Sequence, residues 1–129
     1  TGLLNHPGEA MGYRVSLQDR AVAYITDTEH FSDRLDKNVL ELADRADVLI
    51  YDCTYTDEEY HDPQSGKIGW GHSTWQEGVK LALAANVKKL VIFHHDPSHN
   101  DEFMDLTSSR SIQVFPQSVV AREGMEISI

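Results

Sequence analysis

The sequence is poor in cysteine and in long apolar runs, and each shortage excludes something. With Cys53 as the single cysteine, no internal disulfide can form, and a reducing compartment such as the cytoplasm is favoured. No apolar run approaches the roughly 18 residues that a membrane span needs, and no signal-peptide pattern is present. A membrane protein is therefore not expected.

Basic side chains are also few. Eleven Lys and Arg residues stand against 21 Asp and Glu residues, which gives a net charge of −10. This balance argues against a broad nucleic-acid or membrane-surface interface. It still allows a phosphate substrate if metal ions supply local positive charge. We therefore expect a small phosphodiester or another ester as the substrate, and we do not expect nucleic acid as a partner.

The length and the even composition predict one structural unit. The 129 residues suffice for one ordinary domain, and 40% of them are hydrophobic. No repeat, low-complexity tract or linker-like segment divides residues 1–129. The chain starts at Thr1 rather than at a methionine and runs straight into GLLNHPG, which predicts that it comes from a longer protein.

The hydrophobic periodicity predicts strands and helices that alternate in the middle of the chain, with antiparallel strands at both ends. In chain order we expect strands at MGYRVSL and AVAYITD, a helix from Ser32, a buried strand VLIY, a functional loop over 53–71, a helix from Trp75 to about Asn86, a buried strand LVIF, a short helix after Pro97 and a closing hairpin of VVARE and MEISI. This order predicts an α/β layered architecture.

Chemically active side chains follow the predicted strands. Asp27, Asp52 and His94 come directly after or near the ends of strands, and His6 lies in a Pro-Gly loop before the first one. Strand ends that meet at one sheet edge are where α/β proteins build sites, and imidazoles and carboxylates are ligands that zinc, manganese and iron accept. Taken alone, Asp27 is expected more often to form a turn or cap a helix than to bind metal, and His6 alone is no better a candidate for a metal ligand.

The histidines after LVIF are unequal candidates. His94 and His95 should point to opposite faces because strand side chains alternate, so only one is expected to be a direct ligand. His99 is expected to be solvated or to support the site from a distance, since Pro97 interrupts a continuous helix with His95. Turn and cap roles are expected for the nearby aspartates.

His72 lies just before a helix whose start is marked by Ser73 and Thr74, each three residues before Gln76 or Glu77. The free amide groups of a helix start attract an anion such as phosphate, but the same dipole disfavours a charged imidazole. A carboxylate is needed to keep the ring protonated, and Asp52 is the candidate. Together they could donate a proton to a leaving oxygen.

With these residues assembled, the order of the motifs resembles the second half of the metallo-β-lactamase superfamily, nearest its ribonuclease Z-like and phosphodiesterase-like branch. The motifs are NHPGEAMGYRV, VAYITDTEH, LIYDCTY, GHSTWQEGVKLA and LVIFHHDP. The resemblance implies a four-layer αββα sandwich, of which this chain would supply the C-terminal ββα half.

The resemblance also implies a role for each candidate. His6 would bind the first of two divalent metal ions, Asp27 would bridge both, and His94 would bind the second. Asp52 and His72 would donate the proton. Zinc is the first expectation for the metal, with manganese or iron as alternatives, and the reaction would be hydrolysis by a metal-activated hydroxide.

One motif of the resemblance is missing. The signature His-x-His-x-Asp-His does not occur in these residues, so each metal would keep only two ligands instead of the usual three or four. The isolated chain is therefore expected to bind metal weakly and to catalyse little, as a fragment or as one half of a complex with the missing upstream half.

Two alternatives to the hydrolase remain open. The chain could be a non-catalytic half-domain whose exposed sheet face drives self-association or pairing with the missing half. Alternatively, Cys53 and His72 could act as nucleophile and base. Tyr55, Tyr60 and Trp70 in the loop could line a substrate pocket or serve as surface packing.

Overall fold

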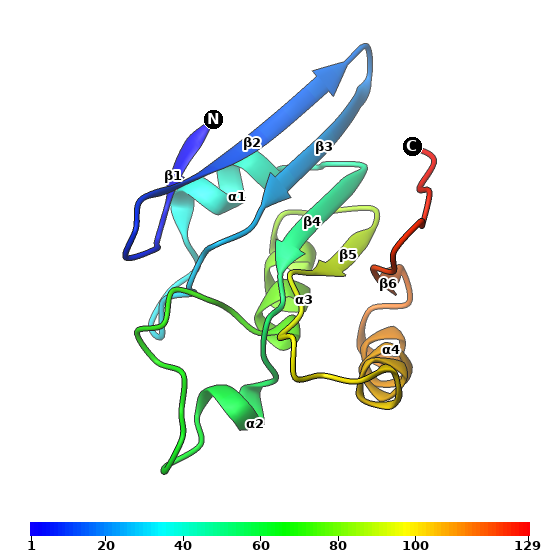
Figure 1. Ribbon diagram of the computed structural model, residues 1–129. Helices are drawn as coiled ribbons and strands as arrows, with labels where there is room; N and C mark the ends of the chain where they lie inside the picture. Colours follow the sequence, from blue (N-terminus) through cyan, green and yellow to red (C-terminus); the bar gives the residue numbers. More distant parts are fainter.

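The computed structural model describes residues 1–129 as one six-stranded sheet with helices on one face (Figure 1). The strands follow the chain in space, in the order β1-β2-β3-β4-β5-β6. The strands are β1 (Gly2–Leu4), β2 (Ala10–Leu17), β3 (Arg20–Ile25), β4 (Val48–Asp52), β5 (Leu90–Phe93) and β6 (Ser118–Val120), and the helices are α1 (Lys37–Ala43), α2 (Asp57–Tyr60), α3 (Trp75–Ala84) and α4 (Asp101–Val114).

The strand directions determine where a site can form. β1, β2 and β3 pair antiparallel, whereas β3, β4, β5 and β6 run parallel. The carboxyl ends of β3, β4 and β5 therefore meet at one edge of the sheet, and the turn between β1 and β2 reaches the same edge. We call this the site edge.

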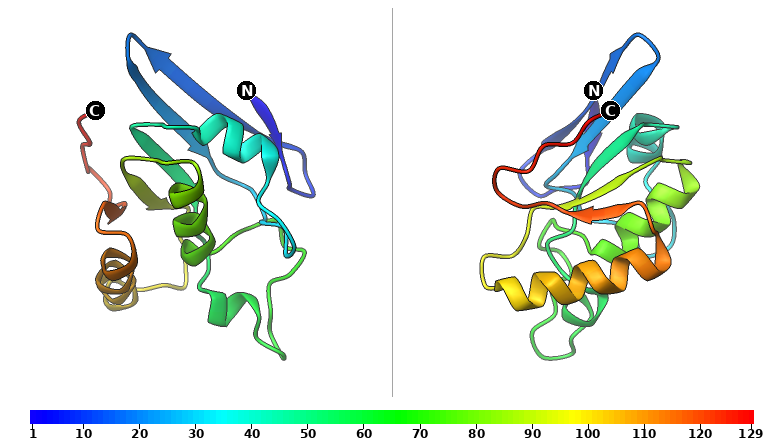
Figure 2. Two further views of the ribbon diagram at one scale, coloured as in Figure 1. Left: turned by 180° about the vertical axis from the view of Figure 1, so that it is seen from behind. Right: turned by 90° about the vertical axis from the view of Figure 1, so that its right-hand side faces the viewer.

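The helices α1, α3 and α4 cover one face of the sheet, whereas α2 lies beyond the strand ends (Figure 1 and Figure 2). α1 packs against β1, β2 and β3, α3 against β4 and β5, and α4 against β6. Crossovers between neighbouring parallel strands are right-handed, so connections that all step in one direction leave their helices on the same side. The core between these two layers includes fully buried Ile25, Leu49, Leu90 and Ile92.

The opposite face of the β2–β3 hairpin carries exposed apolar side chains, and we call it the open face. Tyr13 pairs with Tyr24 across the two strands, so their side chains share this face. Its exposed members are Met11, Tyr13, Val15, Leu17 and Tyr24. No helix of this chain covers them in either view of Figure 2.

Each helix begins at a polar cap. The N-caps are Asp36, Thr56, Thr74 and Asn100, and each side chain accepts from a backbone amide of the first turn. The two overlapping capping patterns before α3 were expected to act together, but only Thr74 caps this helix. Ser73 is buried, and its Oγ instead lies 3.0 Å from His30 Nδ1.

The predicted α/β class is confirmed, with differences at four segments. β1 precedes the first predicted strand, and α2 lies within the predicted loop. The helix after Pro97 has 14 residues and is not short. The closing hairpin was wrong, since no strand follows β6 and MEISI pairs with nothing. No helix is long and apolar enough to cross a membrane.

Candidate metal and proton-transfer site

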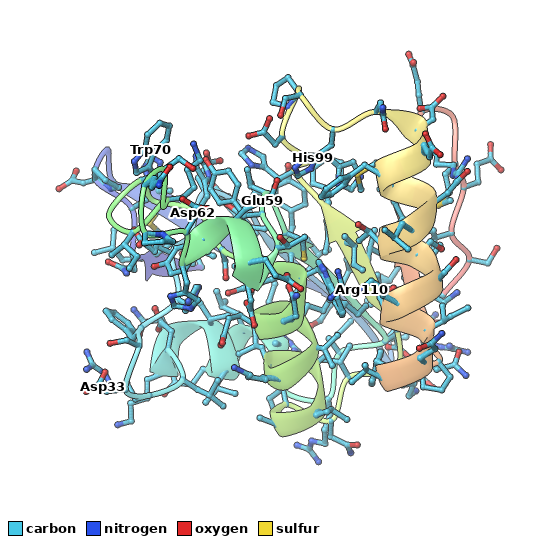
Figure 3. The ribbon with its side chains drawn as sticks, turned by 90° about the horizontal axis from the view of Figure 1, so that it is seen from below. Asp33, Glu59, Asp62, Trp70, His99 and Arg110 are labelled. Atoms are coloured by element: carbon cyan, nitrogen blue, oxygen red, sulfur yellow. The ribbon has the colours of Figure 1, made fainter.

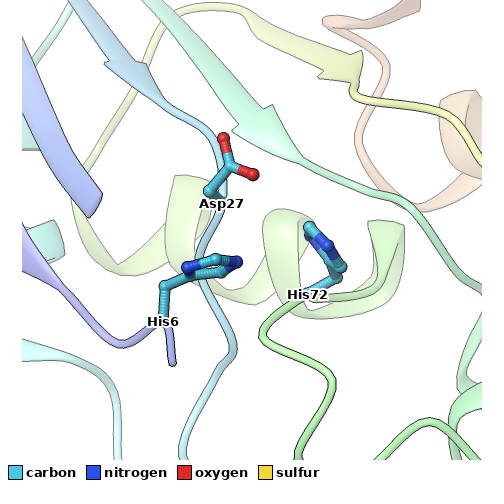
Figure 4. Close-up of side chains that lie close together, drawn as sticks. All are labelled: His6, Asp27 and His72. Atoms are coloured by element: carbon cyan, nitrogen blue, oxygen red, sulfur yellow. The ribbon is translucent and has the colours of Figure 1, made fainter. Parts of the chain in front are cut away.

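The site edge brings together all five residues that the sequence singled out. His6 lies in the turn between β1 and β2, Asp27 follows β3, Asp52 ends β4, His94 follows β5, and His72 precedes α3. Figure 4 shows His6, Asp27 and His72 pointing toward one another from three separate segments. Their individual roles as ligands or proton carrier stay predictions.

Two groups of three side chains have ligand atoms close enough to share an ion. The first consists of His6, Asp27 and His72, and the second of Asp52, His72 and His94; within each group the ligand atoms lie within 4.8 Å of one another. His94 Nε2 also lies 3.6 Å from Asp27 Oδ1, which connects the two groups. The pairs expected from the sequence, His6 with Asp27 and Asp27 with His94, are thus adjacent.

The ring of His94 is held in a way that suits a ligand. Thr54 Oγ1 lies 2.8 Å from Asp52 Oδ1 and 3.1 Å from His94 Nδ1. If the hydroxyl donates to Asp52, its oxygen accepts from a protonated Nδ1, and Nε2 keeps its lone pair. That nitrogen faces Asp27, so its lone pair is available to a metal ion.

His6 needs a rearrangement before its Nε2 can bind metal. The amide of Gly8 donates to His6 Nδ1 over 3.1 Å, so Nδ1 carries no proton in this arrangement. In the neutral ring the proton then sits on Nε2. Ligation through Nε2 requires the proton to move to Nδ1 and the Gly8 hydrogen bond to break.

Asp52 is the buried, firmly held partner of His72 in the predicted proton-donating pair. It is fully buried, and its carboxylate accepts from His72 Nδ1 over 2.9 Å. The backbone amides of Thr28, Thr54 and Ser73 also donate to it. The Asp52 hydrogen bond raises the pKa of His72, against the opposite effect of burial, and Asp27 and Glu29 add to the increase. The expected pairing of Asp52 with His72 is therefore present.

Glu29 is a buried carboxylate that the sequence reading missed. It accepts from the Tyr60 hydroxyl over 2.5 Å and from the amides of Gly69 over 2.6 Å and Gly71 over 2.9 Å. Its backbone pairs with Asn5, next to His6. Glu29 thus fixes the segments that carry His6 and His72 to the end of β3, two residues after Asp27.

The donor set fits a divalent metal, although not a closed structural site. Imidazole and carboxylate are accepted by zinc and related ions, and catalytic zinc sites hold three protein ligands. The first group reaches three only if His72 is counted as a ligand. The second includes Asp52, whose oxygens already accept from several donors. The expected shortage of ligands therefore remains unless His72 gives up its proton-donating role.

The neighbouring candidates lie outside this cluster. His95 turns the other way, as the strand alternation predicted, with Nε2 3.1 Å from the carbonyl of Ala121. His99 was expected to be solvated or near the site, which is wrong: its side chain is 7% exposed, contacts Glu59 over 2.7 Å and stacks on Phe103 (Figure 3). Burial also raises the pKa of the Cys53 thiol, so the Cys53–His72 pair has no support.

The chain also matches a known protein family. The model of the beta-lactamase superfamily domain matches residues 2–95. The chain belongs to this superfamily. The matched segment includes all five residues of the site edge.

Relatives within the superfamily point to one branch of it. The chain is 34% identical to ribonuclease Z of Picrophilus torridus over 98% of its own length and 41% of the relative's length. It is 37% identical to ribonuclease Z of Gemmatimonas aurantiaca over 70% of its length and 27% of the relative's. The ribonuclease Z-like branch expected from the motifs is confirmed, and the chain spans well under half of these relatives. The parent family is one of hydrolases.

Solved structures support the same superfamily fold. The metallo-beta-lactamase fold protein YhfI from Bacillus subtilis aligns with a TM-score of 0.69 at 17% identity, over 95% of this chain and 46% of that one. The short form of human tRNase Z aligns with a TM-score of 0.68 at 22% identity, over 98% of this chain and 40% of that one. At 17% and 22% identity, these alignments show a shared fold and nothing about activity.

The relatives correct the expected partner. A small ester substrate without nucleic acid was inferred from the net charge of −10, but the relatives found in the superfamily are named as ribonucleases. Net charge describes the average surface, whereas binding depends on local charge and on bound ions. The exclusion of nucleic acid was therefore wrong.

Proposed function

We propose that this chain supplies the carboxyl-terminal part of a metal-dependent hydrolase that cleaves phosphodiester bonds in RNA. The observation that carries the proposal is the convergence of three imidazoles and two carboxylates at the site edge, in a chain 34% identical to a ribonuclease Z. In this arrangement, metal ions rather than a basic protein surface would supply the positive charge that faces the RNA phosphate.

Two divalent ions, zinc first, are part of the proposal. His6 and Asp27 would hold one ion, and Asp27 and His94 the other, with further ligands from outside this chain. Bound there, the ions would supply positive charge beside the phosphoryl oxygens and a water of lowered pKa. Asp27 suits the shared position because its carboxylate has two oxygens and lies between the two histidines.

His72 is proposed as the proton donor. Asp52 holds Nδ1 of the ring, so Nε2 remains to face the substrate. The raised pKa of His72 keeps a proton available near neutral pH. Donation to the leaving oxygen would then restore a neutral ring, which bulk water can protonate again because the side chain is partly exposed.

The test is cleavage of an end-labelled single-stranded RNA, with added zinc, by a protein that contains this chain. His94→Ala and His72→Ala should each lower the rate roughly 100-fold or more, and the exposed His61→Ala serves as the control. If His72→Ala lowers the rate and leaves the bound metal unchanged, His72 is the proton donor. If metal is lost with it, His72 is a ligand. Cleavage that survives both substitutions contradicts the proposal.

The open face favours a second candidate role, assembly. Its exposed side chains, among them Val15 and Leu17, form an apolar surface whose contact with water is energetically unfavourable. A second copy of the chain could cover it. Sedimentation velocity should then show self-association of the chain that Val15→Lys reduces, and a monomer at all concentrations would argue against self-association.

A further inference from the structure

Trp70 is the exposed aromatic residue of the loop that precedes His72. Of the three aromatic residues first noted there, Tyr55 and Tyr60 are buried, whereas Trp70 is 58% exposed and stands out at the surface (Figure 3). The Lys67 ammonium lies 4.3 Å from the centroid of the Trp70 ring. One face of the indole thus carries a cation.

The loop holds this pair in a defined position. Gly69 and Gly71 flank Trp70, and the amides of both donate to buried Glu29. Both glycines have positive φ angles, of 86° and 87°, which side chains rarely adopt. The amide of Trp70 also donates to the carbonyl of Lys67 over 3.1 Å. An exposed Trp on a backbone fixed at both sides loses little freedom on binding.

The pair lies beside the site edge. Lys67 Nζ is 5.9 Å from the centroid of the Tyr55 ring, and that ring is 6.3 Å from the ring of His72. A Cβ added to Gly71 would lie 2.5 Å from His6 Cδ2, so the residue after Trp70 touches the predicted metal site. A nucleotide next to the cleaved bond can therefore reach Trp70.

Lys67 forms no direct ion pair, although its charge adds to the hydrogen bonds that lower the pKa of Asp62 and of Asp96. Seven of the eleven cationic side chains form an ion pair with a carboxylate, but Lys67 has no carboxylate within 4.0 Å. Lys67 and Tyr55 line a groove of about 420 Å³ whose other lining includes Glu59, Asp62 and Asp96. These carboxylates disfavour a phosphate inside the groove, so the phosphate is expected on the Lys67 side, near Trp70.

We propose that Trp70 and Lys67 form a nucleotide subsite of the hydrolase. An unpaired base of a single-stranded RNA segment stacks on Trp70, and Lys67 contacts the phosphate attached to it. This rests on the proposed function, because it assigns a position to the RNA next to the cleaved bond. Base–aromatic stacking tolerates any base, so the subsite selects for an unpaired nucleotide rather than for a sequence.

The subsite can be tested without cleavage, on the chain itself. The RNA is a six-residue oligouridine with a fluorescent label, in the presence of a chelator, and binding is followed by anisotropy. Trp70→Leu should weaken binding roughly 5- to 100-fold, while Trp70→Phe, which keeps an aromatic face, should retain most of it. Lys67→Met should lower the slope of log Kd against log salt by about one. Ile68→Ser, at the exposed neighbour, is the matched control.

Tryptophan fluorescence gives an independent readout. Unlabelled oligouridine should quench the exposed Trp70 and leave the buried Trp75 unaffected, so the quenching should vanish in Trp70→Leu. Absent quenching, absent RNA binding, or equal affinity in Trp70→Leu and Ile68→Ser would overturn the subsite, and the cleavage test of the hydrolase would stand unaffected. Conversely, Trp70-dependent binding without cleavage in that test would keep the subsite and remove the hydrolase.

Discussion

Asp27 and His94 share a backbone conformation that side chains rarely adopt. Their φ angles are 59° and 63°, and each lies directly beyond or near the end of a parallel strand. The left-handed region costs an ordinary residue about 1–2 kcal/mol. The fold accepts this cost at both residues, and His94 Nε2 lies 3.6 Å from Asp27 Oδ1.

The backbone of His94 gives a prediction for stability. His94→Gly should be more stable than His94→Ala by about 1 kcal/mol, because glycine adopts positive φ without a steric penalty. The measurement is denaturant unfolding of the two variants. At the exposed helical residue Glu102, as a matched control, Gly should instead be less stable than Ala. Equal stability of the two His94 variants would show that the positive φ angle at this position causes no strain.

His30 gives a prediction for pH. Burial lowers its pKa from 6.5, and His61 adds to this, whereas Glu77, Asp57 and Glu29 oppose it. The unfolded chain therefore takes up the proton first, so the stability contributed by the neutral ring is present above pH 6.5 and is lost as the pH falls through the folded pKa. Between about pH 7.5 and 5.5, unfolding free energy should decrease less in His30→Asn than in the unsubstituted chain. The same decrease in both would contradict this.

Sequence reasoning found the five residues of the site edge but missed those that hold them. The side chain types and their places after strands were visible in the sequence. Thr54 and Glu29 were missed because their partners lie about 40 residues away, at His94 and Gly69 to Gly71. A threonine and a glutamate without such a contact look like ordinary surface residues.

At the level of elements, hydrophobic periodicity predicted the strands and helices beside the site, but it underestimated the length of α4, which has 14 residues. The strands before Asp27, Asp52 and His94 and the helix after His72 were all expected. β1 and α2 have only three and four residues, too short to show a period, and both depend on tertiary contacts. The last residues alternate in polarity like a strand, but they have no partner strand beyond β6.

In the loop between α2 and α3, the amides of Gly69 and Gly71 donate to the Glu29 carboxylate. Glu29→Gln should speed hydrogen exchange of the Gly69 and Gly71 amides roughly 10- to 100-fold, because a neutral amide replaces a charged acceptor. Glu58→Gln, which removes a surface carboxylate paired with Arg110, is the control and should leave both amides unchanged. Unchanged exchange in Glu29→Gln would show that the loop is held by other contacts.

The whole molecule is two layers, a sheet with helices on one face and an open face on the other. The site edge lies at the strand ends and the open face lies on the β2–β3 hairpin, so a substitution such as Val15→Lys should reduce self-association and leave the site-edge residues in place. The five residues of the site edge lie on five different segments. The fold must therefore be complete before these side chains meet. Metal binding should therefore report on the folded chain.

Metal titration followed by NMR of the histidine rings tests the central claim most directly. As zinc is added to the chain, the ring nitrogens of His6 and His94 should shift, and His6 Nδ1 should become protonated as it releases Gly8. His61 and His99 should stay unchanged, and weak affinity is expected because ligands are few. If the rings at the site edge do not shift, or if all seven histidines shift alike, the site edge is not a metal site.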